Sequence, residues 1–493
     1  MADSERTKVR QAMITGVRWL AMARLLAQTS SWVITFIVIR LLSPTDYGLQ
    51  AMVSVVYTLL LLITSSGFDR AIARQKTFGD AELRQMLGFS LLLNTLLLAA
   101  VWAAAPLVAT YYQEPAVIPV LRALSFGFLL NVFSKIPIGL AWRNLDYRTH
   151  ALAKLSGTIT ASLATLLLAL LGAGVWALII GMLVGPAISA LYLQFRTRWL
   201  VLPDFTFNRA ASAIRYAWTI SLGFFVWMLS SRLDILLGGR QLDAAELGLY
   251  AVALQLCTLP MRKVVPLAHE VLYPAYARLQ NDSAAVSGYF HKSLASLSLL
   301  LFPGFFGLAA VSAWAVPVLF GERWLGAEHI IAIVALAMPF RVVTAMCNPM
   351  LQATGNAGVS LSTGIFASAF TAIALLVGLQ WGVTGLAAAT LAAAPVVMSV
   401  VVWQTRQSSG LSFRTLGAGI APPLVLSALM AIIIYRVGIA LTSELSLALV
   451  LILQIIAGII IYFALAYVFS RNNLVSTVSI IRTSLNRRSR RSE

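Results

Sequence analysis

The chain has 493 residues, of which 59% are hydrophobic and only 11% carry a charge. A soluble globular protein is typically about 45–50% apolar and about 25% charged, so this composition indicates an integral membrane protein. The formal net charge of +18 would suggest a nucleic-acid partner in a soluble chain, but the placement of the charges gives a topological explanation instead. Cys257 and Cys347 both lie in apolar runs and predict neither a disulfide framework nor a metal site.

Apolar stretches long enough to cross a membrane recur along the whole chain. A helix needs about 20 mostly apolar residues to span the hydrocarbon core, and the first such stretch is too long and continuous for a cleaved signal peptide. The sequence therefore predicts an all-α integral membrane protein with about 14 transmembrane helices. The predicted spans lie near residues 14–41, 47–67, 86–109, 117–141, 151–171, 174–195, 216–239, 247–275, 291–311, 328–353, 360–380, 383–403, 417–439 and 445–469.

The basic residues between these spans predict the topology. With the N-terminus in the cytoplasm, most lysines and arginines outside the spans fall in cytoplasmic segments, as the positive-inside rule requires. This predicts an even number of spans with both termini cytoplasmic. The basic tail, 471–493, is interpreted as a solvated stop signal, with contact to anionic lipid as the alternative. Only four basic residues lie in outer loops or at their edges: Arg40, Arg240, Arg323 and Arg436.

The chain resembles itself at an offset of about 200 residues. LLSPTDYGLQAMV at 41–53 aligns with QLDAAELGLYAVA at 241–253, pairing Asp46 with Glu246 and Gly48 with Gly248. A weaker match pairs LLGAGVWALII (170–180) with GLQWGVTGLAA (378–388), each a glycine-containing outer turn. Six spans per repeat give both units the same orientation, with a substrate site expected between them near the midplane. The predicted domains are two pseudo-symmetric lobes, 1–200 and 201–410, two further helices in 411–470, and the basic tail 471–493.

Basic residues inside the spans are the strongest functional signal. A charged side chain at a helix centre costs about 2.5–3.5 kcal/mol on translocon scales, so such residues usually face the protein interior or water. Arg18, Arg122, Lys135 and Arg232 lie nearer to a span edge and are expected to snorkel. Four others lie close to mid-span, and we expect them to line a water-filled cavity: Arg24, Arg262, Lys263 and Arg341.

The first and seventh spans carry further polar residues. Arg24, Gln28, Ser31 and Thr35 recur on one helical face, which favours a wet neighbour over simple hydrogen bonding between helices. In SSRLDILLGG (230–239), Arg232 and Asp234 point to nearly opposite sides of the seventh span. We interpret the pair as an outer gate or lock, in which Asp234 is either a partner for another helix or a coupling-ion carboxylate.

The eighth span contains several charged residues and prolines in the stretch CTLPMRKVVPLAHEVLYP (257–274). Lys263 and Glu270 are seven residues apart and share a face, and His269 beside Glu270 suggests proton handling. Pro260 and Pro266 are expected to interrupt the helix, as happens at transporter sites and hinges, although a purely structural kink is the alternative. Four cations with few acids predict an anionic cargo such as a diphosphate, because arginine matches phosphate oxygens with a forked geometry.

Three loop segments carry a family resemblance. LSPTDYGLQAM, SSGFDRAIARQKTF and PIGLAWRNLDYRTHALAKL follow the first, second and fourth spans. They resemble Wzx-like bacterial polysaccharide flippases, of the superfamily that also holds multidrug exporters and the lipid II flippase. The resemblance implies a bacterial inner-membrane location, a polyprenyl-diphosphate-linked oligosaccharide as cargo, and alternating access without ATP hydrolysis. It also implies neighbouring partners, namely a polysaccharide polymerase and export machinery, and no cofactor.

Two other functions are alternatives to a flippase. A multidrug exporter of the same fold would have acidic residues inside the first lobe's spans, and none lies at mid-depth. A membrane polymerase or ligase would need a sizeable outer loop for its catalytic groups, and the predicted outer loops are short, so no enzyme is expected. Aromatic residues at span edges are interpreted as interfacial anchors, with sugar stacking as the alternative: Tyr111, Tyr112, Trp324 and Trp381.

Overall fold

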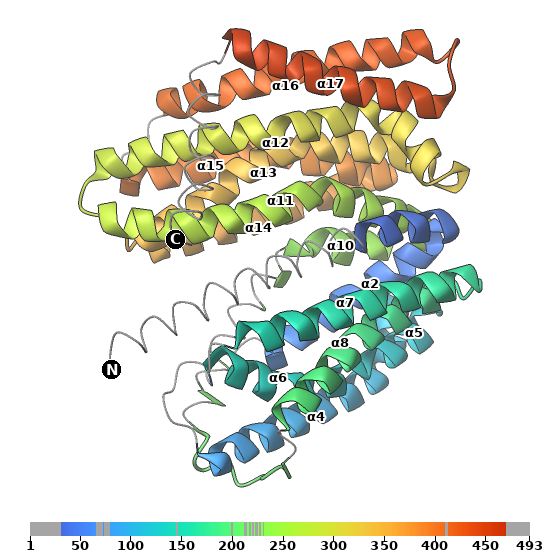
Figure 1. Ribbon diagram of the computed structural model, residues 1–493, viewed down its shortest axis with the longest axis vertical. Helices are drawn as coiled ribbons and strands as arrows, with labels where there is room; N and C mark the ends of the chain where they lie inside the picture. The colour runs from blue at the N-terminus through green and yellow to red at the C-terminus, as the bar shows by residue number, and fades with distance from the viewer. Residues whose placement is uncertain are drawn as a thin grey trace. The chain divides into compact units, whose positions relative to one another are not determined.

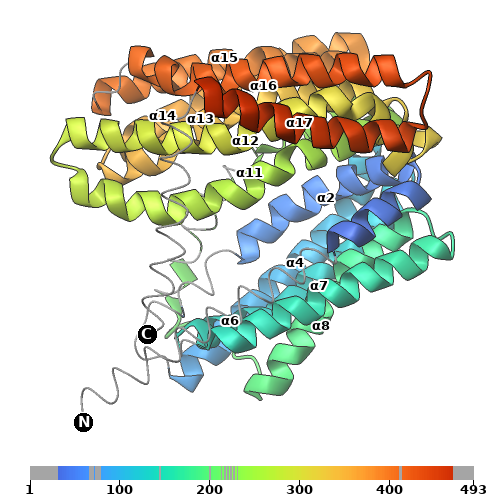
Figure 2. The same cartoon turned by 45° about the horizontal axis from the view of Figure 1, so that its top comes forward.

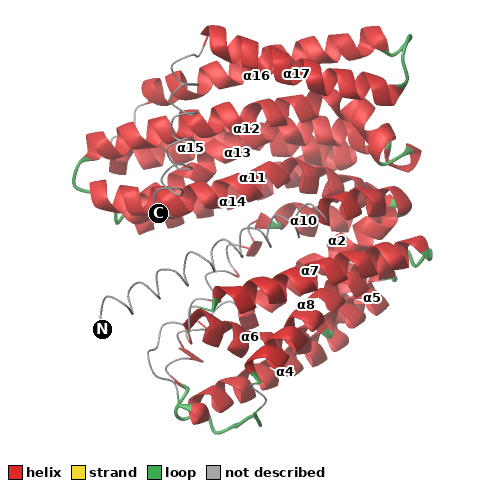
Figure 3. Ribbon diagram, viewed as in Figure 1, coloured by secondary structure: helices red, strands yellow, loops and turns green. Residues whose placement is uncertain are grey.

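The computed structural model is helical over nearly all the residues that it describes, and no strand occurs among them (Figure 3). Eleven described stretches are long and apolar enough to cross a membrane. One of them, Gly358–Arg406, contains two of the predicted spans; most of the predicted span 14–41 and part of the predicted span 216–239 lie outside the described part of the chain. The described residues are 31–65, 79–143, 146–198, 201–211, 231–409 and 413–469, with isolated positions at 72, 214, 215, 218, 221, 225, 228 and 229.

The chain divides into two compact units, Met1–Gly248 and Leu249–Glu493. In the first unit α7 packs along α8, α6 packs on α8, and α4 packs on α5 (Figures 1 and 2). The short helix α10 packs on α2 and α4 and so belongs to this unit, although the sequence repeat counts it with the second lobe. The helices are α2 (Pro44–Ser65), α4 (Asp80–Tyr112), α5 (Val117–Ser125), α6 (Gly127–Arg143), α7 (Tyr147–Leu170), α8 (Val175–Thr197) and α10 (Leu233–Gln241).

The second unit is built around α12, which packs on both α13 and α16. α13 and α14 each pack on α15, and α16 and α17 lie side by side against α12 (Figure 1). The last two predicted helices, α16 and α17, therefore pack against α12 as part of this unit. The helices are α11 (Ala244–Leu279), which begins in the first unit, α12 (Ser283–Leu319), α13 (Ala327–Ala353), α14 (Ala357–Gly378), α15 (Gly382–Ser409), α16 (Phe413–Leu441) and α17 (Leu447–Phe469).

One prediction about α11 is wrong. Pro260 and Pro266 were expected to interrupt this helix, yet α11 runs without a break through both of them and through Pro274. Each proline removes one N–H from the hydrogen-bond ladder, but neighbouring turns hold the backbone helical. Along the same helix the Thr258 hydroxyl donates to the Leu254 carbonyl at 2.7 Å.

The paired segments of the sequence repeat have the same local structure. Ser43 and Asp46 cap α2 reciprocally, with Ser43 N donating to Asp46 Oδ2 at 2.9 Å and Asp46 N to Ser43 Oγ at 3.3 Å. At the equivalent start of α11, Glu246 N donates to the Asp243 carboxylate at 2.8 Å. The Asp–Glu pairing of the alignment therefore marks two equivalent helix beginnings.

Two glycines of the repeat also meet in space within the first unit. A side chain on Gly48 would overlap the carbonyl oxygen of Ala244, and one on Gly248 would overlap the carbonyl oxygen of Pro44. The two contacts are equivalent, because Gly48 and Pro44 correspond to Gly248 and Ala244 under the 200-residue offset. α2 and the start of α11 therefore cross about a local twofold axis. Glycine permits backbones to approach this closely in membrane proteins.

The loop after α8 is fixed to the start of α4. The Gln85 amide donates to Asp204 Oδ2 at 3.2 Å and to Thr206 Oγ1 at 2.7 Å, while its oxygen accepts from Arg209 N and Ala210 N at 2.9 and 3.1 Å. Hydrogen bonds from the Thr206 backbone and from Gln85 lower the pKa of Asp204. One buried glutamine thus holds residues 204–210 in place.

Candidate functional site

One face of α11 is exposed and polar at the middle of the helix. Arg262 and Lys263 lie at the midpoint of this 36-residue helix and are exposed, as are Glu270 and Tyr273 further along. On a helical wheel these residues fall within about a third of a turn of one another, whereas the apolar exposed Leu267 and Val271 lie to one side. A polar stripe through a membrane-spanning helix requires a polar or hydrated neighbour.

Two polar contacts relate α11 to α13. The Cys257 thiol is 3.5 Å from the Ile331 carbonyl, and the His269 ring donates to the carbonyl of Ala345. The contacts advance in the same direction along both helices, so α11 and α13 run parallel. This register brings Arg341, one turn before Ala345, to a depth between that of Lys263 and that of His269.

Arg341 lies one residue from the midpoint of α13, a helix of 27 residues that is mostly buried. It is half-buried, and Thr344, Asn348 and Gln352 follow it at spacings of three, seven and eleven residues. These spacings place all four side chains on one face of the helix, and Asn348 and Gln352 are exposed. α13 therefore carries a polar stripe of its own, which begins at a mid-span arginine.

His269 links the two helices that carry these stripes. Its ring is half-buried against α13, and its Nε2 atom has no hydrogen-bond partner among the described residues. Since the ring already donates to the Ala345 carbonyl, Nε2 is left as the acceptor of a neutral imidazole or the second donor of a protonated one. Together, α11 and α13 form what we call the α11–α13 polar face: Arg262, Lys263, His269, Glu270, Tyr273, Arg341, Thr344, Asn348 and Gln352.

Five of the sequence-predicted site residues lie on these two helices: Arg262, Lys263, His269 and Glu270 on α11 and Arg341 on α13. Arg24 and Gln28 lie outside the described residues. Thr344, Asn348 and Gln352 are not among the predicted site residues, because single polar residues in an apolar span are usually interpreted as helix–helix contacts. Their shared spacing with Arg341 was the available signal.

Arg232 and Asp234 lie at the start of α10 in the first unit. Arg232 is the residue before the helix, and Asp234 is buried with Oδ1 accepting from Ile235 N at 2.8 Å. α10 is held to the end of α4 by the Tyr111 hydroxyl, which donates to the Leu236 carbonyl at 3.1 Å. The Arg240 guanidinium lies 5.4 Å from the Tyr111 ring centroid.

Three of the four aromatic residues at span edges have different roles from those predicted. Trp324 is fully buried and Tyr112 is 3% exposed, so neither is an interfacial anchor or a free surface for sugar stacking. Tyr111 holds α10 in place. Trp381 is 68% exposed at the turn between α14 and α15, which fits the predicted anchor.

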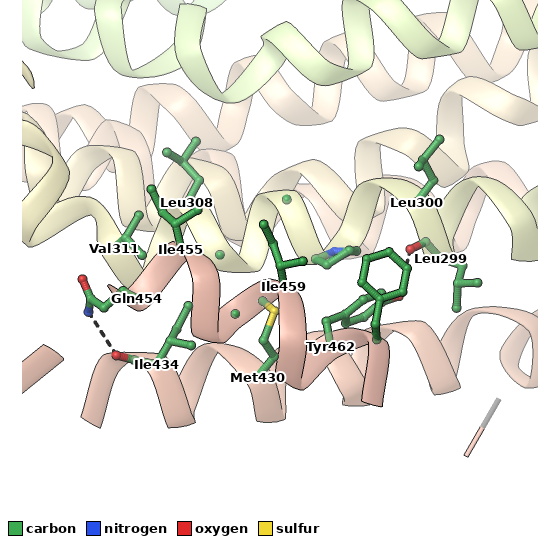
Figure 4. Close-up of a pocket in the computed structure, with 15 residues that line it drawn as sticks. Leu299, Leu300, Leu308, Val311, Met430, Ile434, Gln454, Ile455, Ile459 and Tyr462 are labelled. Atoms are coloured by element: carbon green, nitrogen blue, oxygen red, sulfur yellow. Dashed lines mark hydrogen bonds between the residues drawn. The ribbon is translucent and has the colours of Figure 1, made fainter. Parts of the chain in front are cut away.

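An apolar pocket of about 650 Å³ lies among α12, α16 and α17 (Figure 4). Gly304 and Gly307 on α12 and Gly458 on α17 leave its space open. Its two polar residues are bonded to the backbone, since Gln454 Nε2 donates to the Ile434 carbonyl at 3.0 Å and the Tyr462 hydroxyl to the Leu299 carbonyl at 2.8 Å. The remaining lining is apolar, so the pocket suits a hydrocarbon chain.

Comparison with solved structures defines the class of fold. The lipid II flippase MurJ in an inward closed conformation superposes with a TM-score of 0.74, covering 92% of this chain and 99% of MurJ at 14% identity. An inward-facing multidrug resistance MATE transporter gives a TM-score of 0.62, covering 79% of this chain and 98% of that protein at 15% identity. At these identities the likeness establishes the fold alone, which is that of the MurJ and MATE transporters.

The family follows from sequence comparison. The model of the polysaccharide biosynthesis protein family matches residues 37–329, so the chain belongs to this family. The lipopolysaccharide biosynthesis protein WzxC of Escherichia coli K12 is 25% identical over 451 residues, covering 89% of this chain and 90% of WzxC. The succinoglycan biosynthesis transport protein ExoT of Rhizobium meliloti 1021 is 22% identical over 338 residues, covering 68% of each chain.

These findings confirm the resemblance to Wzx-like flippases drawn from the loop segments. They also confirm a multi-pass protein of the bacterial inner membrane.

Proposed function

We propose that the protein is a flippase that moves a polyprenyl-diphosphate-linked oligosaccharide from the cytoplasmic to the outer leaflet of the inner membrane. The observation that carries this is the α11–α13 polar face, where Arg262, Lys263 and Arg341 lie at mid-helix. Family membership and the MurJ-like fold support transport rather than catalysis. The proposal includes fourteen spans, cytoplasmic termini, the repeat-defined lobes 1–200 and 201–410, and a neighbouring polymerase and export machinery.

The chemistry required is electrostatic. A diphosphate must cross the region where a bare charge is most costly, and fixed guanidinium groups replace the water that it loses. Arginine can bind two phosphate oxygens at once in a planar fork, whereas Lys263 provides a point charge. Arg24 and Gln28 are proposed to contribute to the same site. Because no covalent bond is made or broken, the protein needs only two states that expose this face alternately.

The tie between α10 and α4 is proposed as the outer gate. Tyr111 and Tyr112 hold Leu236 and Gly239, and a side chain on Gly239 would strike the Tyr112 ring. Release of α10 from these contacts would allow α10, which contains Asp234 and follows directly after Arg232, to move away from α4. Asp234 then changes from a buried group to a solvated one, which supports its role as partner or coupling carboxylate. His269 and Glu270 are the other proposed coupling residues.

The apolar pocket among α12, α16 and α17 is proposed to hold the polyprenyl chain of the substrate. Replacing both Gly304 and Gly307 with leucine is expected to reduce export about tenfold, because the new side chains fill the pocket. The fold should tolerate them, since a Cβ at Gly304 meets nothing within 4 Å and one at Gly307 lies 3.7 Å from Met430 Cε. Export of surface polysaccharide and protein abundance in membranes measure the effect.

A matched control for this variant is Gly364→Leu. Gly364 lies on α14, outside the pocket, and a Cβ there also meets nothing within 4 Å. Normal export by the double pocket variant would show that the pocket is not used by the substrate.

Two competing functions make different predictions. A multidrug exporter of this fold would carry cations, which the arginines of the α11–α13 polar face would repel. A polymerase or ligase would act only after the substrate has reached the outer leaflet. The site of substrate accumulation therefore separates these functions.

The test is a chromosomal deletion followed by leaflet assignment. Spheroplasts are treated with periodate, which does not cross the membrane and oxidises only sugars on the outer leaflet. A flippase deletion should accumulate a lipid-linked saccharide that resists periodate. Oxidised saccharide would indicate a polymerase or ligase, and intact polymer with new sensitivity to cationic drugs would indicate a drug exporter.

A further inference from the structure

The second half of the α13 stripe has a chemistry different from that of Arg341. Thr344, Asn348 and Gln352 are neutral, and they extend from the mid-span arginine to the C-terminal end of the helix. Eleven residues of helix span about 16 Å, a length comparable with a short oligosaccharide. The α13 stripe thus has a cationic end and a neutral end.

The hydrogen-bonding atoms of these three residues are set up differently. The Thr344 hydroxyl donates to the Phe340 carbonyl at 3.0 Å, which leaves its oxygen as an acceptor. Asn348 Oδ1 accepts from the Ser360 hydroxyl at 3.0 Å, which fixes the amide and turns Nδ2 into the outward donor. Gln352 is exposed and makes no side-chain hydrogen bond to any described residue, so it offers both donors and acceptors.

Such an array fits poorly against lipid. Amide groups in contact with hydrocarbon lose their hydrogen bonds to water without replacement. Asn348 lies five residues before the end of α13, about 7.5 Å inside the helix end, so its exposed amide favours a polar neighbour there. Hydroxyl groups of a sugar satisfy one donor and one acceptor at a time and match amide and threonine side chains.

We propose that Thr344, Asn348 and Gln352 form the sugar-binding strip of the transport site and determine which saccharide is carried. The inference rests on the proposed function and adds to it the recognition of the neutral part of the substrate. In this proposal Arg341 binds the diphosphate, and the strip forms hydrogen bonds with the sugars nearest to the diphosphate. Tyr273 is exposed on α11, and in this proposal it supplies an aromatic surface for the same sugars.

The test compares two ligands on the purified full-length protein in nanodiscs. Farnesyl diphosphate carries the charged group and a short isoprenoid chain but no sugar. The second ligand is the lipid-linked repeat unit isolated from the deletion strain. Asn348→Ala and Gln352→Ala should each weaken binding of the repeat unit about three- to tenfold and leave binding of farnesyl diphosphate unchanged. Arg341→Ala should weaken binding of both ligands.

The control variant is Ser362→Ala, which removes an exposed hydroxyl of α14 that donates to the Val359 carbonyl. It should bind both ligands as the wild type does. If Asn348→Ala and Gln352→Ala bind the repeat unit like the wild type while Arg341→Ala does not, the sugar strip is wrong and the diphosphate site stands. If wild-type protein binds neither ligand, the proposed function itself fails. Equal loss of both ligands in the Asn348 and Gln352 variants would show a structural role and overturn the strip.

Discussion

Alanine in place of Arg262 or Arg341 is expected to abolish export of surface polysaccharide without removing the protein from the membrane. A charged hydrogen bond to phosphate contributes about 1.5–3 kcal/mol, so losing one should reduce transport by at least about tenfold. Both side chains are partly or fully exposed, and their removal leaves no cavity in a packed core. Surface polymer in the complemented deletion strain, normalised to the membrane abundance of each variant, measures the effect.

The charge explanation has two matched controls. Arg436→Ala removes an exposed arginine near the end of α16 in the same unit and should leave export unchanged. Arg341→Lys keeps the charge but loses the planar fork, so it should retain part of the activity. Arg24→Ala belongs in the same series, because the sequence predicts it at mid-span. Normal export by the Arg262 and Arg341 variants would remove these residues from the site and leave the fold untouched.

Leucine in place of Gly157 is expected to destabilise the first unit strongly. Gly157 lies at the crossing of α7 and α8, where a Cβ would overlap Ser189 Oγ and lie 2.5 Å from the Gly185 carbonyl oxygen. The Ser189 hydroxyl also donates to the Ala153 carbonyl across this crossing, at 2.9 Å. Because one of the obstacles is backbone, the helices must separate, at a cost of about 3 kcal/mol.

Thermal unfolding of the detergent-purified protein tests this expectation. The melting temperature of Gly157→Leu should fall by about 5–10 °C, and its abundance in membranes should fall as well. Gly364→Leu, at an open helical position, is the control and should unfold like the wild type. An unchanged melting temperature for Gly157→Leu would mean that the two helices are not packed as closely as described.

Hydrophobicity predicted where the helices lie better than where they end. The predicted span 328–353 matches α13, yet the predicted span 291–311 corresponds to α12, which runs from Ser283 to Leu319. The apolar length of a span reflects the thickness of the hydrocarbon core, whereas a helix continues into the interface through polar residues such as Ser283. The predicted span 117–141 is divided into α5 and α6 at Phe126, and only the following Gly127 marks that division in the sequence.

The candidate site was predictable in its charges and not in its neutral parts. Mid-span arginines are conspicuous in an apolar chain, so Arg262 and Arg341 could be selected from the sequence alone. The bond from His269 to Ala345 links residues 76 positions apart, and no local pattern encodes that register. The apolar pocket is formed by glycines, whose missing side chains leave no chemical signal in a search for reactive groups.

The two helix beginnings at Ser43 and Asp243 point to how the chain arose. Different residues perform the same capping there, while Gly174 and Gly382 share a backbone with positive φ, 58° and 66°, at the starts of α8 and α15. Such agreement in backbone geometry with little shared sequence is what we would expect if half of the chain had been duplicated, as the proposed sequence repeat implies. In that proposal the ancestral half paired with a second copy of itself across the Gly48–Gly248 crossing. The two halves then changed their side chains independently, and α11 and α13 acquired the mid-helix cations Arg262, Lys263 and Arg341.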